Sequence, residues 1–482
     1  MSHSDDASFR ILVLGDFSGR GSRGEHAPEE LTRRRLHRVD RDEFEGLFAK
    51  LGVAVRLTSS PDAIPVDLPL RSLDDLHPDR LLETVAAFGE LRALRRRLND
   101  PRSFADAARE LGAAAVPGRP ATPAPAPAAP ATDDLLGAAL AATDAGNAAR
   151  GRGAELVDAL LRELVVPHLS PAPDPRRDGL LAAVDGATGA LLRTLLRQPA
   201  VRALECAWRG LELLLRRLDT DAVVHLELLD LTRAELRAAL GDEPLAGGFG
   251  RRLVEGSRHT PGAEPWSLLV LAESFDATPD DARFLARLGG LAMALDAPLV
   301  AAGNAALVGC AAGEPPTEPD AWNEHPEGAA QAAWQALRVS PCAGWLALTW
   351  PRLLLRLPYG ARGGSVEGLA FEELADADDH EGYLWGSGAF AVAIHLGSES
   401  ERLGGDLRAD ACVELAELPA HVRERDGETT LQPCAELVLT ERAAERVRAA
   451  GLLPLRAMKG RDAVQLGPLR ALDGGLLRGR WS

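Results

Sequence analysis

The sequence predicts an α/β protein in which mixed sheets are covered by helices, with two main domains joined by a linker rich in alanine and proline. Short apolar runs typical of buried strands alternate along the chain with amphipathic segments of helical period. At 482 residues the chain exceeds what one ordinary hydrophobic core supports, so two or three domains are expected. The alanine- and proline-rich stretch, residues 113–132, separates the two patterned regions.

The first element is the apolar strand Ile11–Leu14, followed by Gly15 and Asp16. The loop after it spaces Gly19, Gly21 and Gly24 as in a dinucleotide-binding fingerprint, but residues 33–40 are too basic for the amphipathic helix that such a site requires. A flexible glycine loop is therefore the favoured interpretation. A nucleotide-binding or enzymatic protein that uses the Gly15–Gly24 loop remains the alternative.

The rest of the first domain alternates in the same way. A helix is expected over Asp42–Leu51, strands over Val53–Leu57 and Ile64–Leu70, and one helix over Leu81–Leu98, where apolar residues recur every three or four positions. The linker cannot bury enough surface to fold, and as an extended spacer of about 3 Å per residue it reaches roughly 60 Å. The predicted boundaries are residues 1–112 for the first domain, 113–132 for the linker, 133–198 for a helical segment and 199–482 for the second domain.

The second domain opens on an amphipathic helix that begins at Pro199. Its apolar stripe includes Trp208, which favours a core anchor, and Glu205 pairs with Arg209 at i,i+4 spacing on the other face, as Glu212 does with Arg216. A capping box, Thr232 with Glu235, predicts the next helix. Further strands are expected at 222–229, 268–271, 299–302, 413–418, 436–439 and 452–455, and helices after Thr278 and Thr440.

The most unusual stretch runs from Trp345 to Glu373 and reads WLALTWPRLLLRLPYGARGGSVEGLAFEE. A fully apolar strand ends at Pro351, and Arg352 and Arg356 then interrupt a run of leucines that must be buried. Both arginines are therefore expected to form satisfied ion pairs, with Glu372 and Glu373 as candidate partners. A turn at Pro358, Tyr359 and Gly360 precedes a glycine-rich crossing, and the whole stretch is expected to be an assembly surface.

Motifs for catalysis, metals and cofactors are not found. Lys50 and Lys459, the only two lysines, lack P-loop context, and no serine has the G-x-S-x-G setting. The acidic cluster Asp376, Asp378, Asp379, His380 and Glu381 lacks the spacing of a calcium loop. We therefore predict no catalytic, cofactor-binding or metal-ligating residues.

Charge and composition restrict the partners and the compartment. The net charge of −17 argues against nucleic acid. The five scattered cysteines fit reduced thiols, and the polar N-terminus does not resemble a signal peptide. The best candidate for a membrane span is the stretch cut by Arg352 and Arg356, which leaves it short of the roughly 20 apolar residues required. A bacterial cytoplasmic protein without direct membrane insertion is expected.

Several motifs together resemble the contractile sheath of type VI secretion. The large subunit (TssC/VipB-like, EvpB family) is similar in PRLLLRLPYGARGGSVEGLAFEE, in Pro199–Leu215, in Trp266–Ala302 and in Tyr383–Gly386. The small subunit (TssB/VipA-like) is similar in LVLGDFSGRG, in VDRDEF and in LRSLDDLHPD, all within the first 79 residues. The chain thus resembles both subunits fused into one polypeptide.

This resemblance implies a sheath-subunit-like fold and a structural role without catalysis. It implies that the two halves pack together as the family's heterodimer does, and that the partners are other sheath subunits or copies of the chain, with the inner-tube protein, the baseplate and the recycling ATPase as further partners. The implied assembly motif comprises Gly15, Asp16, Phe17, Trp208, Arg209, Gly210, Arg352, Arg356, Pro358, Tyr359, Gly360, Glu367, Gly368, Glu372, Glu373, Trp385 and Gly386. The large subunit's C-terminal region finds no match, so the chain alone is expected to be a monomer or small oligomer.

Overall fold

The computed structural model divides into two compact units, each built from segments that are distant in sequence. It describes residues 8–57, 66–100, 102–114, 176–220, 222–241, 245, 248–258, 264–310, 317–323, 326–376, 379–403, 407–425 and 428–481. The first unit is drawn from residues 1–53, 204–357 and 376–482, and the second from residues 54–203 and 358–375. The sequence-based boundaries at 112, 132 and 198 stay a prediction, and most of residues 113–175 lies outside the described chain.

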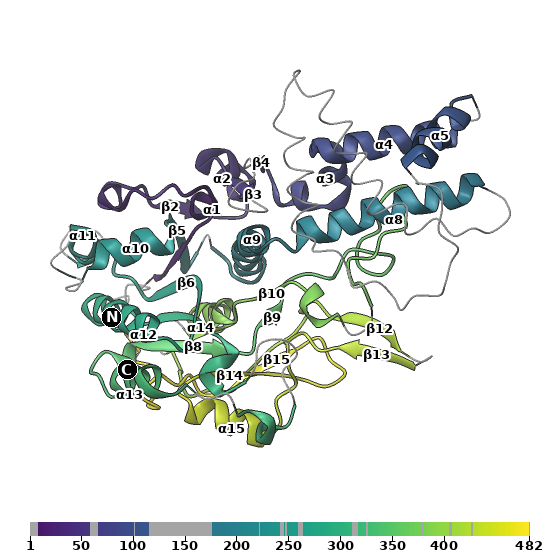
Figure 1. The fold of residues 1–482 in the computed structure, drawn as a ribbon. Helices are drawn as coiled ribbons and strands as arrows, with labels where there is room; N and C mark the ends of the chain where they lie inside the picture. The colour runs from purple at the N-terminus through teal and green to yellow at the C-terminus, as the bar shows by residue number, and fades with distance from the viewer. Residues whose placement is uncertain are drawn as a thin grey trace. The chain divides into compact units, whose positions relative to one another are not determined.

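A nine-stranded mixed sheet forms the centre of the first unit (Figure 1). In spatial order its strands are β11 (Val413–Leu415), β15 (Val464–Leu466), β14 (Leu453–Ala457), β8 (Leu346–Trp350), β7 (Leu299–Gly303), β6 (Leu268–Phe275), β1 (Phe9–Gly15), β5 (Val224–Asp230) and β2 (His37–Val39). The strands from β14 to β5 are parallel, and β2, β15 and β11 are antiparallel to their neighbours. This architecture confirms the predicted mixed α/β class.

Strand β1 lies between two strands that follow it by more than 200 residues. Phe9–Gly15 pairs with Val224–Asp230 on one side, and Ile11–Leu14 pairs with Leu268–Leu271 on the other. The four side chains from Ile11 to Leu14 are fully buried. A strand covered on both faces reads as an unbroken apolar run, which is why this short motif is visible in the sequence.

Helices cover both faces of this sheet. Leu12 and Leu14 join one large core cluster with residues of α10 (Arg233–Leu240), α11 (Gly248–Arg258), α12 (Pro279–Leu295), α13 (Gly328–Arg338) and α15 (Glu441–Ala449). The alternate residues, Ile11 and Val13, face the other way, where α14 (Ala389–Leu403) contacts β1, β5, β6 and β7. Burial of both faces follows from this arrangement.

Three helix starts confirm the predicted caps. Thr232 and Glu235 form a reciprocal capping box, and the Thr278 and Thr440 side chains accept hydrogen bonds from Asp281 N and Ala443 N.

The remaining described elements of the first unit are α1 (Arg20–Arg23), η1 (Pro28–Glu30), α2 (Phe44–Leu51), most of α9 (Pro199–Arg217), η5 (Ala305–Val308), η6 (Pro319–Ala321), η7 (Ala343–Trp345), the β9–β10 pair (Leu353–Leu354 with Trp385–Gly386), η8 (His380–Gly382) and the β12–β13 hairpin (His421–Arg425 with Glu428–Gln432).

The second unit is mainly helical. It holds the β3–β4 hairpin (Ala54–Leu57 with Val66–Pro69), η2 (Leu73–Leu76), α3 (Pro78–Thr84), α4 (Ala86–Asn99), α5 (Phe104–Ala114), α8 (Arg176–Leu196), the first residues of α9 and the loop 358–375. Helix α4 packs against α5 and α8, and Arg95 forms a two-pronged ion pair with Asp185 at 2.5 and 3.1 Å.

Several predicted elements differ in the structure. The helix expected over 81–98 is two helices, because Val85 adopts an extended conformation (φ −82°, ψ 117°) that keeps its side chain buried at the junction. The strand expected at 436–439 does not form. Instead the amide of Glu436 donates to Arg352 O. The basic stretch 33–40 supplies edge strand β2, and the glycine loop contains the one-turn helix α1.

Within the described chain, α8 is the one helix whose length and composition would suffice to cross a membrane. Its window Arg177–Leu196 has a mean hydropathy of 1.3, and 56% of it is already buried within the protein. A core helix has the same properties, so this is weak evidence for a membrane span. The finding corrects the expectation that the stretch around Arg352 is the best candidate.

The close approach of α9 to α14 predicts an asymmetric effect of adding one methyl group. A Cβ on Gly210 would overlap the ring of Phe390, whereas a Cβ on Gly46 in α2 meets nothing within 4 Å. Gly210→Ala is expected to lower the free energy of unfolding by about 1–3 kcal/mol through overpacking. Gly46→Ala should instead stabilise the protein by up to about 1 kcal/mol, the usual helix preference for alanine. Urea denaturation of both variants checks this, and equal effects would contradict the packing described.

Candidate functional site

The N-terminal segment is held in the first unit by a cluster of aromatic rings around Trp208. The indole is fully buried, stacks on Phe48 with ring centroids 3.9 Å apart, and meets Phe17 and Phe44 edge-on at 5.4 and 5.6 Å. Its Nε1–H donates to Phe17 O at 2.9 Å. The predicted core role of Trp208 is confirmed, and it ties α9 to a segment almost 200 residues earlier.

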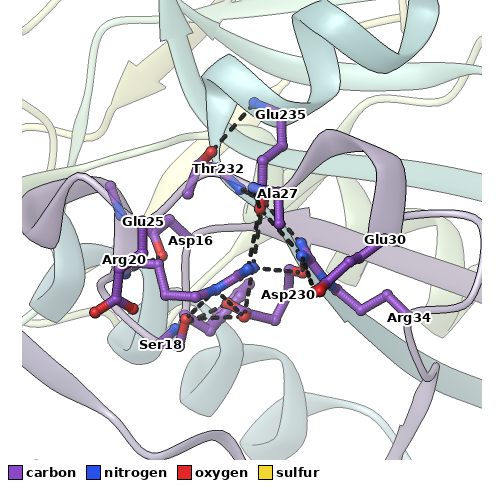
Figure 2. A network of polar contacts seen from close by, with 12 residues as sticks. Asp16, Ser18, Arg20, Glu25, Ala27, Glu30, Arg34, Asp230, Thr232 and Glu235 are labelled. Atoms are coloured by element: carbon purple, nitrogen blue, oxygen red, sulfur yellow. Dashed lines mark hydrogen bonds and ion pairs between the residues drawn. The ribbon is translucent and has the colours of Figure 1, made fainter.

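A second anchor is the buried carboxylate of Glu235, shown in Figure 2. Its oxygens accept from Arg20 Nη1 at 3.0 Å and Arg34 Nη1 at 2.7 Å. They also accept from the amides of Ala27 and Thr232 at 2.9 and 2.8 Å. One side chain on α10 thus binds three points of the segment 20–34.

Asp230, at the end of β5, continues this network (Figure 2). Its carboxylate accepts from the amide and the hydroxyl of Ser18, both at 2.8 Å, and pairs with Arg20 at 2.9 Å.

The contacts of Glu235 also change its pKa. Burial opposes the charge of Glu235, but the bonds from Arg34, Thr232 and Ala27 and the charge of Arg20 lower its pKa to about 2. Arginine pairing therefore keeps a fully buried carboxylate ionised.

The glycine loop that follows β1 is occupied by its own carboxylate. Asp16 accepts from the amides of Arg20 and Gly21 at 2.9 and 2.7 Å, and a Cβ on Gly21 would lie 2.7 Å from Asp16 Oδ2. Helix α1 spans only four residues, with Gly19 and Gly24 in left-handed conformations at its ends. In a dinucleotide site these amides would face a phosphate. Gly15 allows close packing of β1 on β6, since a Cβ there would lie 3.0 Å from that of Ala272.

Arg356 forms a buried ion pair with Glu205. Its Nε and Nη2 donate to the two carboxylate oxygens at 2.6 and 3.2 Å, and the two residues are 8% and 0% exposed. Arg209 lies 3.6 Å from the same carboxylate and 3.1 Å from Glu212. Glu205 is thus on the buried side of α9, which corrects the surface position expected for it.

Arg352 pairs with Glu436 and Glu381. Its Nε and Nη2 donate to the oxygens of Glu436 at 2.9 and 2.6 Å, and Nη2 lies 3.3 Å from Glu381. These partners correct the expectation that Glu372 or Glu373 pairs with Arg352. Burial opposes the charge of Glu436, but Arg352 and His380 lower its pKa to about 2.

The ligand atoms of His380, Glu381 and Glu436 lie within 4.8 Å of one another, the one grouping of metal-binding type in the part of the chain that the structure describes. The guanidinium of Arg352 contacts both carboxylates and supplies the positive charge there. Asp378, from the acidic cluster noted in the sequence, is outside the described residues.

Trp385 and Gly386 form β10, which pairs antiparallel with Leu353 and Leu354. The Trp385 indole donates to His380 O at 2.9 Å. A Cβ on Gly386 would overlap Leu355, so glycine is required for this close approach. Pairing with β10 therefore fixes the position of Leu353 and Leu354, which lie between Arg352 and Arg356.

The turn at Pro358, Tyr359 and Gly360 lies in the second unit, together with Glu372 and Glu373. The amide of Glu373 donates to Tyr359 O, and the Glu373 carboxylate accepts from the amide of Tyr359, both at 2.8 Å. The Glu372 carboxylate accepts from the amide of Ala361 at 3.0 Å. Gly360, at φ +153°, has no room for a Cβ beside the Glu372 carboxylate. Pro358 is buried at the start of this turn.

The same loop, residues 358–375, contacts His77 and Asp79, which also belong to the second unit. The amide of Glu367 donates to Asp79 at 2.9 Å, next to Gly368 at φ +70°, and the rings of Tyr359 and His77 meet edge-on at 5.0 Å. The predicted motif residues thus divide between the two units.

Four carboxylates hold arginines from distant segments, a role that the local sequence pattern did not predict: Glu205, Asp230, Glu235 and Glu436. Two of them had a usable signal. Glu205 follows Leu204 and precedes Trp208 by three residues, so it lies on the apolar stripe of α9, and Glu235 was visible as a capping residue. The arginine partners come from distant segments, which local patterns do not show.

Two family models match the chain, and together they cover the segments that these contacts join. The VipB family model, described as EvpB/VC_A0108, tail sheath N-terminal domain, matches residues 178–468, more than half of the chain. The chain belongs to this family of tail-sheath proteins. The model for VipA, described as type VI secretion system, VipA, VC_A0107 or Hcp2, matches residues 3–114. The chain therefore carries a VipA-like segment and a VipB-like segment, as the sequence motifs predicted.

A curated relative supports the VipB match. The type VI secretion system sheath protein TssC1 of Pseudomonas aeruginosa is 28% identical over 293 residues, which is 59% of this chain and 59% of that protein. The match thus spans less than two thirds of the relative. Strand β1, Phe17, Arg20 and Arg34 belong to the VipA-like segment, and Trp208 and Glu235 to the VipB-like segment, so the anchors above join the two.

The buried pair predicts unequal effects of two arginine substitutions. Arg356→Ala removes both short hydrogen bonds from the buried Glu205 carboxylate and leaves it Arg209 at 3.6 Å, which costs about 3–5 kcal/mol. Arg216→Ala, whose side chain is 68% exposed beside Glu212, should cost less than about 1 kcal/mol. Denaturation of both variants measures this, and a harmless Arg356→Ala would show that the pair is not desolvated.

The depressed pKa of Glu235 predicts a defined acid response. Because its pKa falls from an ordinary 4.5 to about 2, the unfolded state binds more protons between these values, and stability falls as the pH drops through that window. Above about pH 5 this contribution is fully present and constant. Glu235→Gln should reduce the slope of stability against pH below 4.5 by up to about 1.4 kcal/mol per unit. An unchanged slope in the variant would contradict the assignment.

Proposed function

We propose that this protein is a structural subunit of a type VI secretion sheath in which one chain supplies both the small- and the large-subunit parts. The observation that carries the proposal is the position of β1, a VipA-like strand, between β5 and β6 of the VipB-like segment. Two segments that share one sheet act as one building block, and a covalent link makes their association independent of concentration.

The charged residues support a structural rather than a catalytic role. Glu205, Glu235 and Glu436 are each bound by arginine, and such satisfied pairs hold segments in place without leaving a free acid or base. The proposed partners are copies of this chain or other sheath subunits, and by family membership the inner-tube protein, the baseplate and the recycling ATPase. Family membership is also the reason why we propose a location in the bacterial cytoplasm.

The alternative of a nucleotide-binding protein is less well supported. The amides of Arg20 and Gly21 already donate to Asp16, and a phosphate placed there would face that carboxylate. The glycine spacing is explained by the tight turn around Asp16.

Electron microscopy of mixed assemblies tests the proposal. Purified protein carrying a gold-labelled tag is added to conventional small and large sheath subunits while they polymerise. We expect gold along the tubes or at their ends, because the shared sheet presents the same sheath-type surfaces. An unrelated acidic protein with the same tag serves as the control, and gold at the control level would contradict a sheath role.

A further inference from the structure

A cavity of about 210 Å³ lies in the second unit and is lined by residues of α3, α4, α8 and the loop 358–375. Its buried part is formed by Leu82, Leu91 and Thr188, and Leu369 lines it from the loop. A cavity of roughly 150 Å³ is enough for benzene, whereas drug-sized ligands need about 300 Å³ or more. The space therefore suits a small organic group with an apolar part.

The mouth of the cavity is at the protein surface. Four of the lining residues are exposed: Arg96, Asn99, Glu367 and Gly368. The backbone of Gly368 is left-handed at φ +70°, and a Cβ there would meet no atom within 4 Å, so the space beside it is open. A ligand from solution can therefore reach the buried leucines.

Three arginines of α4 line the cavity, and they differ in their partners. Arg95 donates to Asp185 at 2.5 and 3.1 Å, so these two charges compensate each other. Arg92 makes a single side-chain hydrogen bond within the described chain, from Nη2 to Glu83 O at 3.4 Å, and its Nε is buried without an acceptor. The side chain of Arg96 forms no hydrogen bond or ion pair with any residue that the structure describes.

One carboxylate lines the cavity besides that of Asp185. The Glu367 side chain is exposed at the mouth, and its backbone amide is bound to Asp79. Among the described residues it forms no ion pair with an arginine. Once the pair of Arg95 with Asp185 is set aside, two guanidinium groups remain beside one exposed carboxylate, and the remaining charge of the lining is positive.

We propose that this cavity binds a carboxylate carried on a short aliphatic stem. The guanidinium groups of Arg92 and Arg96 keep N–H donors without an acceptor in the described chain, and a planar carboxylate can accept two parallel bonds from one guanidinium. The stem would lie on Leu82, Leu91 and Leu369 and exclude water from the apolar part of the cavity. A small free acid and the side chain of a protein glutamate share this chemistry.

Titration of the full-length protein with small probes tests the site. The probe is 4-methylpentanoate, measured by isothermal titration calorimetry. 4-Methylpentanamide serves as the uncharged probe of the same shape, and acetate as the probe that lacks the stem. We expect both of these to bind at least tenfold more weakly than 4-methylpentanoate. Equal binding of either one would overturn the inference.

Arginine substitutions locate the bound probe. Arg92→Gln should raise the Kd of 4-methylpentanoate at least tenfold, whereas Arg97→Gln, on the same helix but outside the lining, should change it less than twofold. If Arg92→Gln does not fold, Arg96→Gln replaces it, because that side chain is exposed and has no partner in the described chain. An unchanged Kd in the folded variant would overturn the inference.

A further probe distinguishes the two sources of the carboxylate. N-acetyl-glutamate methylamide carries the side chain of a protein glutamate, and its glutamine analogue is the uncharged control. Tighter binding of this probe than of 4-methylpentanoate would assign the site to a side chain of a protein partner. Tighter binding of 4-methylpentanoate would assign it to a small free acid. Failure of both acids to bind at millimolar concentration would overturn the inference.

Discussion

The structure depends on the insertion of one short strand, β1, between two parallel strands of a mixed sheet. Its backbone groups face two neighbouring strands, and its four central side chains are buried on both faces. A strand in this position cannot be removed without exposing the edges of β5 and β6, which are themselves apolar. The VipA-like segment is therefore part of the core of the first unit rather than an attachment to it.

The same principle extends to the polar contacts. Glu205, Glu235 and Glu436 are buried carboxylates, and each binds an arginine from a segment far away in the chain. Such pairs contribute little net stability over an apolar replacement, but losing one partner is costly. Their effect is to specify which segments meet. In the second unit the bond from Glu367 N to Asp79 also joins the VipB-like and VipA-like segments.

The sequence revealed what depends on local pattern. The apolar strands, the caps at Thr232, Thr278 and Thr440 and the core position of Trp208 follow from short-range periodicity and were predicted. The break at Val85 was missed, because the apolar spacing continues through it while only the backbone turns. The i,i+4 pairs of Glu205 with Arg209 and Glu212 with Arg216 were predicted, but the ion-pair partners distant in sequence were missed, because the strand order sets them and places residues 20 and 235 together. The glycine spacing alone could not show what fills the loop, which is the Asp16 carboxylate of the chain itself.

Cutting the chain between the VipA-like and VipB-like segments tests whether the two form one folded core. A protease site is placed within residues 117–130, and the cleaved protein is examined by size-exclusion chromatography at micromolar concentration. Both fragments are expected to elute together in a one-to-one complex, because β1 remains paired on both sides. Separation of the fragments into two folded species would contradict it.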